Sequence, residues 1–162
     1  MSTPRELTIG RATWDRLVVE LHWRTENESH ESGAFLLGHL TDSGRRVTEV
    51  LYFDDLHADV HANGMVELPA AAFRQLWAIV KERGVQVVAD IHVHPYGVGQ
   101  SWIDQQNPLI AQRGHIALIL PNFARPPIRP EAVGVYVYEG DHRWQVVGGY
   151  GSRFLRWEKD YD

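Results

Sequence analysis

The chain has 162 residues, of which 44% are hydrophobic and 23% charged, so a single globular domain over residues 1–162 is expected and disorder or a fibrous repeat is excluded. The formal net charge is −5, and Lys and Arg form no concentrated basic face, so nucleic acid is not an expected partner. There is no cysteine, which excludes disulfides, a thiol nucleophile and a cysteine-bound metal. Any metal must therefore be held by histidine and carboxylate.

The N-terminal segment MSTPRELTIG lacks the apolar core of a secretory signal. No later segment approaches the ~20 consecutive apolar residues that a membrane-spanning helix needs. We therefore expect, as the default, a cytoplasmic protein that does not engage a membrane.

The first half of the chain predicts one helix and one hairpin. Residues 13–24 have apolar side chains at the i, i+3, i+4, i+7 spacing of an amphipathic helix, with Thr13 as a plausible N-cap. Residues 34–40 and 46–53 have the composition of strands, and the Thr-Asp-Ser-Gly segment 41–44 between them is a turn signal. These two strands are expected to pair antiparallel.

A second helix is predicted over residues 69–83, with Pro69 at its first position and Gly84 just beyond its end. Residues 85–94 are rich in β-branched side chains and alternate toward their end, which predicts a largely buried strand that Pro95 terminates. The polar residues of interest lie at the exit of this strand.

The remaining segments predict further strands and a short helix. Residues 101–113 are expected to form a helix that bends near Asn107-Pro108, and residues 115–120 a buried strand. A proline-rich loop follows over 121–130, and then a strand pair over 133–138 and 144–147. Alternating helices and hairpins predict an α/β or α+β fold whose mixed sheet is flanked by two or three helices.

Two histidines at the exit of the predicted buried strand suggest a metal site. His92 and His94 project from the same face of a strand, about 6.6 to 7 Å apart along the chain. Zinc in a catalytic site is usually bound by such imidazoles, one further protein ligand and a water. Taken alone, however, a His-x-His pair on a strand is more often two ordinary polar side chains.

Asp104 is the best candidate for the third ligand. Gly97 and Gly99 permit the chain to reverse after the strand, and Ser101 can cap a helix whose first turn carries Asp104. The partial positive charge of a helix N-terminus favours the ionised carboxylate that a metal requires. By itself, Ser-x-x-Asp at a helix start is usually a variant of the capping box.

Together, His92-x-His94-Pro95 and Ser101-x-x-Asp104 closely resemble the JAMM signature of the JAB/MPN metalloproteases. The family also has a glutamate upstream, at the entrance to a strand that ends in glycine, and the segment from Glu31 to Gly38 looks like that element. Two departures concern the backbone. Only five residues separate Pro95 from Ser101, an interval that is commonly a residue or two longer in the family, and Ala34 stands where the family often has glycine.

The resemblance covers residues 31–123 and implies a single-domain MPN/JAB fold of the cytidine-deaminase-like type. It also implies a hydrolase with one zinc ion per chain, bound by His92, His94 and Asp104. Glu31 would accept the proton of the attacking water and return it to the leaving amine. Ser101 would donate a hydrogen bond to the oxyanion, while its role as a helix N-cap stays open beside this one.

Other polar residues carry weaker signals. Asp90 shares the predicted face of His92 and could accept a hydrogen bond from an imidazole, or be a buried structural aspartate. His57 and His61 have i, i+4 spacing but lie in a segment without helix signals, so they are more plausible as loop residues than as ligands. Trp102 could line a substrate groove. No partner pattern is evident for five histidines: His22, His30, His39, His115 and His142.

The resemblance is greatest to bacterial members encoded beside E1-like and E2-like proteins, on the segments GQSxxDxxNP and HIALILPNF. It implies a zinc peptidase or isopeptidase that cleaves after the C-terminal glycine of a ubiquitin-like protein, with a setting in antiviral defence. Two alternatives remain: a peptidase acting on a small sulfur-carrier protein, and a non-catalytic MPN scaffold. Scaffold members usually lack one or more ligands, whereas all the signature residues are present in this chain.

Overall fold

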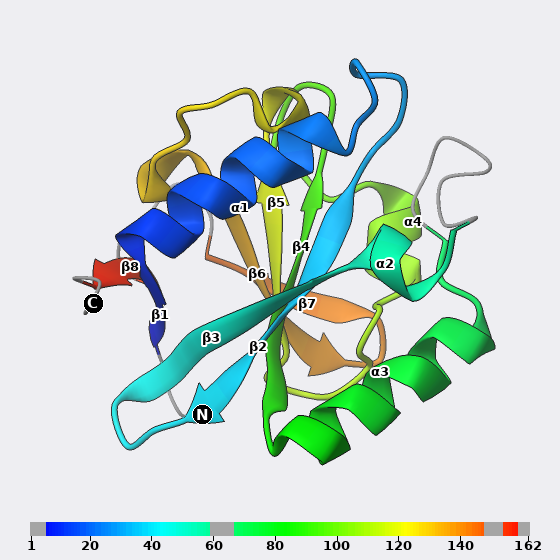
Figure 1. The fold of residues 1–162 in the computed structure, drawn as a ribbon, viewed down its shortest axis with the longest axis vertical. Helices are drawn as coiled ribbons and strands as arrows, with labels where there is room; N and C mark the ends of the chain where they lie inside the picture. The colour runs from blue at the N-terminus through cyan, green and yellow to red at the C-terminus, as the bar shows by residue number, and fades with distance from the viewer. Residues whose placement is uncertain (1–5, 59–66, 148–153, 159–162) are drawn as a thin grey trace.

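The computed structural model describes residues 6–58, 67–147 and 154–158, which form one mixed eight-stranded sheet with helices packed against it (Figure 1). In chain order the elements are β1 (Glu6–Gly10), α1 (Arg11–Trp23), β2 (Gly33–Leu40), β3 (Gly44–Tyr52), α2 (Phe53–Leu56), α3 (Ala70–Arg83), β4 (Gln86–Val93), α4 (Trp102–Gln106), β5 (Ile116–Leu120), the 3-10 turns η1 (Asn122–Ala124) and η2 (Pro130–Ala132), β6 (Gly134–Gly140), β7 (Arg143–Val146) and β8 (Leu155–Glu158). No helix of the described part is long and apolar enough to cross a bilayer. The expected mixed α/β fold is confirmed.

The strand order is β7-β6-β5-β4-β2-β3-β1-β8, so β4 lies inside the sheet between β5 and β2. β4 pairs parallel with β5 and antiparallel with β2. β1 pairs parallel with both β3 and β8, and the other neighbours are antiparallel. Both backbone edges of β4 are therefore engaged within the sheet.

The two faces of the sheet have separate apolar cores. On one face, α1 packs its buried side chains, including Trp14 and Leu21, against residues such as Leu36 and Ile91. On the opposite face, Phe35 and its neighbours pack against α2 and α3. Adjacent residues of a strand point to opposite faces. Figure 1 shows α1 and α3 lying on either side of the central strands.

The start of α1 differs from the prediction. The helix begins at Arg11, and its N-cap is Gly10, which has no side chain to cap it. Thr13 is therefore not the cap and lies inside the first turn. The reason is that β1 leads directly into α1, so the chain turns at the last residue of the strand. The predicted apolar positions do form the buried face of the helix.

The hairpin of β2 and β3 is confirmed, with the turn closed by a 2.7 Å hydrogen bond from Thr41 N to Gly44 O. Pro69 is the N-cap of α3 and not its first helical residue; its carbonyl accepts the Ala72 N–H at 2.9 Å. Gly84 ends α3 in the left-handed conformation, with φ of 66°. That geometry costs glycine little and explains why the helix stops there.

One prediction about the second half is wrong, and the sequence patterns miss two short strands, one near each end of the chain. α4 ends at Gln106, so residues 107–113 do not continue the helix, because Pro108 can donate no helical hydrogen bond and restricts the residue before it. The strands β1 and β8 were not anticipated. β1 has five residues and β8 has four, which is too few for a clear alternation pattern. β8 buries Leu155 although charged residues lie near it in the sequence.

Candidate metal centre

β4 directs the two candidate histidines away from α1. Ile91 and Val93 are fully buried in the core beneath α1, so the intervening His92 points to the other face of the sheet. His94 follows the end of β4, and its backbone is held on both sides: its N–H donates to Leu120 O at 2.9 Å and its carbonyl accepts from Phe123 N at 2.9 Å. The imidazoles therefore project from rigid backbone.

The three candidate ligands converge. The Nε2 atoms of His92 and His94 are 2.9 Å apart, and the Asp104 carboxylate lies 3.5 Å from the first through Oδ1 and 3.2 Å from the second through Oδ2. Tetrahedral ligands at about 2.0 to 2.1 Å from zinc would lie roughly 3.3 Å from one another. The donor types and their spacing thus fit a zinc ion, and all three predicted ligands meet at one point.

Asp104 reaches the histidines because the loop after β4 leads into α4. At the start of this helix, the Asp104 N–H donates to Ser101 Oγ at 3.0 Å, and Asp104 Oδ2 accepts the Ser101 N–H at 2.8 Å. This reciprocal pair is a capping box, which fixes the carboxylate within the first turn. The short loop between Pro95 and Ser101 therefore does not prevent the ligands from meeting.

Electrostatics around the cluster favour a bound cation. Burial alone would raise the pKa of the Asp104 carboxyl, but hydrogen bonds from His92 and His94 outweigh it and hold this pKa well below its usual range. Burial alone would lower the pKa of His92, but the hydrogen bond and charge of Asp104, with the charges of Asp90 and Glu31, raise it. Asp104 is therefore ionised at neutral pH, as a metal ligand must be.

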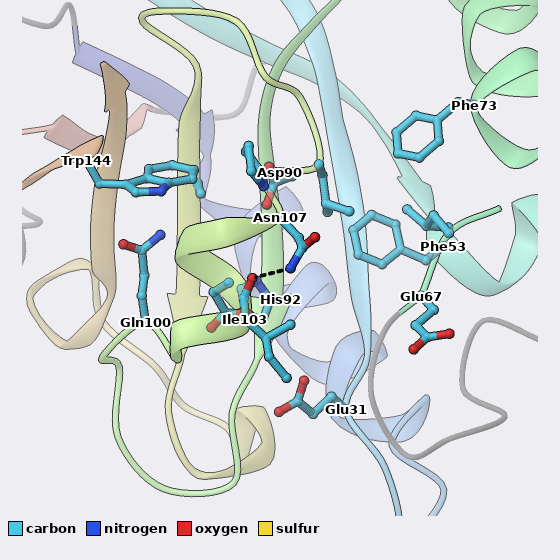
Figure 2. Close-up of a pocket in the computed structure, with 15 residues that line it drawn as sticks. Glu31, Phe53, Glu67, Phe73, Asp90, His92, Gln100, Ile103, Asn107 and Trp144 are labelled. Atoms are coloured by element: carbon cyan, nitrogen blue, oxygen red, sulfur yellow. Dashed lines mark hydrogen bonds and ion pairs between the residues drawn. The ribbon is translucent and has the colours of Figure 1, made fainter. Parts of the chain in front are cut away.

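Glu31 lies at the margin of the same cavity, just before β2 (Figure 2). Its backbone is anchored by the 2.9 Å contact of its carbonyl with His30 Nδ1, and by the bond from Val93 N to the carbonyl of Ser32 at 3.0 Å. Burial raises the pKa of the Glu31 carboxyl, although the nearby His92 and His94 lower it in part. A raised pKa brings a carboxylate closer to the range in which it can exchange protons near neutral pH.

Ser101 has the capping role that the sequence left open. Its Oγ accepts the Asp104 N–H, and this bond does not use the proton of the hydroxyl. The side chain is exposed at the start of α4. The residue can therefore cap the helix and donate a hydrogen bond to a ligand at the same time.

The cluster opens into a cavity of about 610 Å³, whose polar lining includes Glu31, His92 and Asp104. Figure 2 shows Phe53 and Phe73 on one side of this cavity and Trp144 on the other. These three aromatic residues lie on α2, α3 and β7, and no local sequence signal connects them with the histidines. Trp102 is 73% exposed and is not among the lining residues, whereas its neighbour Ile103 is.

Asp90 and His115 form a buried pair that the sequence did not reveal. His115 Nε2 lies 2.6 Å from Asp90 Oδ2, and both side chains are at most 4% exposed. Asp90 therefore pairs with a histidine for which the sequence shows no partner pattern, and the described residues include no hydrogen bond between Asp90 and His92. His22 also has a partner, with Nδ1 at 2.8 Å from Phe123 O. His57 lies just after α2, and His61 lies outside the described residues.

Comparisons with known proteins give a similar sequence and similar folds. No protein-family model matches the chain. A protein of Sinorhizobium fredii named "probable metalloprotease" is 27% identical over 130 residues, which are 80% of this chain and 80% of that protein. This similarity extends over most of both chains.

Two solved structures are similar in fold. A solution structure from Desulfitobacterium hafniense has a TM-score of 0.64 at 14% identity, covering 95% of this chain and 94% of that one. Another, from Salinibacter ruber, has a TM-score of 0.57 at 21% identity, covering 86% and 87%. These similarities extend over nearly the whole chain and concern the fold alone.

Proposed function

We propose that this protein is a zinc-dependent peptidase or isopeptidase of the JAB/MPN type, with one zinc ion held by His92, His94 and Asp104. The observation that carries the proposal is the convergence of these three ligand atoms within 4.8 Å of one another, at a cavity that Glu31 also lines. The similarity to a probable metalloprotease supports the same class of activity. The presence of all the required residues favours an enzyme over a non-catalytic scaffold.

Each side chain of the site has a separate role in the proposed reaction. A zinc ion held by these residues would supply a Lewis acid, which polarises a carbonyl and lowers the pKa of bound water from 15.7 to about 7. Glu31 accepts a proton from the attacking water and delivers it to the leaving nitrogen, the exchange for which its raised pKa suits it. Ser101 donates its hydroxyl proton to the substrate oxygen that gains negative charge.

The proposed substrate is the C-terminal tail of a ubiquitin-like protein, cut after its last glycine in a tail extension or a lysine-linked conjugate. This part depends on the resemblance to bacterial proteins encoded beside E1-like and E2-like partners, with a role in antiviral defence. Strand addition by an extended tail requires a free edge. β4 has none, and in the described sheet the edge strand that contributes to the cavity is β7, through Trp144.

A peptidase acting on a sulfur-carrier protein is the second candidate, and the charge of the cavity argues against it. Release of a single amino acid would place a free α-carboxylate in the cavity. Among the described lining residues there is no Lys or Arg to pair with it, and Glu67 adds a carboxylate that is not assigned to the metal. An internal amide, which has no charge there, is the better fit.

The first experiment measures metal content. The purified protein is expected to bind about one zinc ion per chain by elemental analysis, and variants with His92→Ala or His94→Ala are expected to lose it. Full zinc occupancy in the double variant would contradict the ligand assignment. The zinc-loaded protein is then given a ubiquitin-like protein from the same gene neighbourhood, extended by a peptide at its C-terminal glycine. Cleavage directly after that glycine is expected, and a chelator should abolish it.

A further inference from the structure

One wall of the cavity is apolar and lies beside the candidate metal centre. Phe53, Leu68, Phe73 and Leu109 all line the cavity that His92 and Asp104 also line. They come from α2, from the segment before α3, from α3 itself and from the segment after α4. A cavity of about 610 Å³ is within the range of pockets that enclose a whole ligand group, and it exceeds what a glycine backbone needs.

The apolar wall is held rigidly from behind by a buried ring. Phe35 is fully buried, and its ring centroid lies 4.9 Å from that of Phe53 and 6.2 Å from that of Phe73, in edge-to-face geometry. Leu68 and Leu109 pack against the same core cluster. Aromatic pairs of this kind fix ring orientation in addition to burying area. The wall is therefore a formed surface and not a set of loose side chains.

Gly33 brings this wall close to the metal ligands. It is the register partner of His92 across β2 and β4, and paired residues on adjacent strands lie about 4.5 to 5.5 Å apart. A Cβ at this position would lie 2.4 Å from the Phe53 ring and 2.7 Å from Ile91 O. The absence of a side chain at Gly33 lets Phe53 lie over the backbone directly opposite His92. The apolar surface thus begins one strand away from the candidate zinc ligand.

We propose that Phe53, Leu68, Phe73 and Leu109 form a substrate subsite for a bulky apolar side chain, leucine-like or aromatic, within three residues of the scissile amide. This inference builds on the proposed function and specifies its substrate class. A substrate with only small residues near the cleaved bond would leave the wall in contact with water. The described lining contains the carboxylate of Glu67 and no Lys or Arg, which disfavours an acidic side chain.

The substrate preference is measured with a library of peptides blocked at both ends and given to the zinc-loaded protein, with cleavage sites read by mass spectrometry. We expect leucine or aromatic residues within three positions of each cleaved bond, and none of the acidic residues. Replacing that side chain with alanine should lower kcat/KM by tenfold or more, because each methylene in an apolar pocket is worth about 10- to 200-fold. Cleavage without any apolar preference would overturn the subsite.

A variant pair separates recognition from a loss of stability. Phe73→Ala should lower kcat/KM for leucine peptides by about tenfold and shift the preference toward tryptophan, because the wall recedes. Trp77→Ala on the same helix is the matched control, since Trp77 is 48% exposed and is not among the lining residues. It should leave the ranking of substrates unchanged. An equal loss for every peptide in the Phe73→Ala variant would contradict the proposal.

A binding measurement keeps the subsite testable if no peptide is cleaved. The zinc-loaded Glu31→Gln variant is immobilised, and the blocked peptides that it retains are identified with and without the added Phe73→Ala change. Selective retention of apolar peptides that Phe73→Ala weakens would support the subsite while leaving the hydrolase proposal unsupported. Retention that is independent of apolar content would overturn the subsite, whatever the outcome for catalysis.

Discussion

At the scale of single residues, Glu31 differs from the three candidate metal ligands in its chemistry. It lies on the segment before β2 and lines the cavity, and it is not part of the group of atoms that could hold a metal. Burial raises the pKa of its carboxyl, while the neighbouring histidines pull that pKa down. A carboxylate in this position can transfer protons without binding the ion.

Glu31→Gln is therefore expected to abolish hydrolysis and to keep both zinc and fold. Loss of a positioned general base typically lowers the rate by about 10²- to 10⁴-fold. Elemental analysis gives the zinc content, circular dichroism the fold, and a single-turnover assay the rate. A variant that hydrolyses substrate at the wild-type rate would show that the proton travels through another group.

Zinc affinity should depend on pH through His92. In the protein without metal the pKa of His92 is raised, so its proton persists to a higher pH than in a free histidine and must be displaced when zinc binds. As pH falls through this pKa, the Kd for zinc should rise by about tenfold per pH unit. Asp104 adds no slope near neutral pH, because its pKa is held well below the usual range.

The measurement is a competition titration against a chelator of known pH dependence, between pH 5.5 and 8. Asp104→Asn removes the charge that raises the pKa of His92, so the sloped region should move to lower pH in that variant, on top of a general loss of affinity. A Kd for zinc that does not change over this pH range would contradict the assignment of His92 as a ligand.

At the scale of elements, two left-handed turns meet beside the site. Glu26, Asn27 and Glu28 have positive φ just before Glu31, and the three residues of η1 have positive φ just after β5. Such conformations cost non-glycine residues roughly 1 to 2 kcal/mol each. An ion pair joins the turns, with Arg125 Nη2 at 2.7 Å from Glu28 Oε2. It connects the segment that carries Glu31 to the turn that bonds the backbone of His94.

Arg125→Ala is expected to lower kcat by roughly threefold to tenfold with little change in zinc content. The pair is exposed, so its contribution to stability should be under ~1 kcal/mol, and the effect should come from the position of Glu31. Arg46→Ala is a suitable control, because the Arg46–Glu158 pair joins β3 to β8 at the other end of the sheet. Equal effects of the two variants on kcat would contradict a positioning role for Arg125.

An element can be predicted from the sequence when the residues that determine it lie close together in the chain. The β2-β3 hairpin, β4, α3 and the capping box at Ser101 depend on nearby residues, and the sequence predicted all of them. The short strand β1 is held between β3 and β8, and in the described sheet β8 pairs with β1 alone; no local pattern in the sequence encodes these pairings. The Asp90–His115 pair and the apolar wall around Phe53 likewise consist of residues from distant segments, which come together only when the strands pair in the sheet.

At the scale of the whole molecule, selectivity should reside in the tail of the substrate. The described loop over residues 121–130 contains only short 3-10 turns, and it offers no folded element that could grip a second ubiquitin-like body. The leaving partner should therefore contribute little to kcat/KM, provided that the tail supplies the apolar side chain for the subsite. The enzyme is expected to accept varied leaving groups on one tail.

The measurement compares one cognate tail fused to several peptides and linked through lysine to several proteins. Values of kcat/KM that differ by less than about tenfold correspond to under ~1.4 kcal/mol of discrimination and would support recognition of the tail. A preference of several hundredfold for one leaving partner would mean that a further binding surface selects it.

The position of β4 inside the sheet has a consequence for how the metal would leave. His92 lies on a strand whose backbone is bonded on both sides, whereas Asp104 lies on a helix of five residues with no buried side chain. Backbone amides of β4 should exchange with deuterium only on global unfolding, and those of α4 by local opening. Zinc release should then begin with Asp104, so the dissociation rate should follow the opening rate of α4. Asn107→Ala, which removes the bond to Ile103 O, should accelerate both rates together.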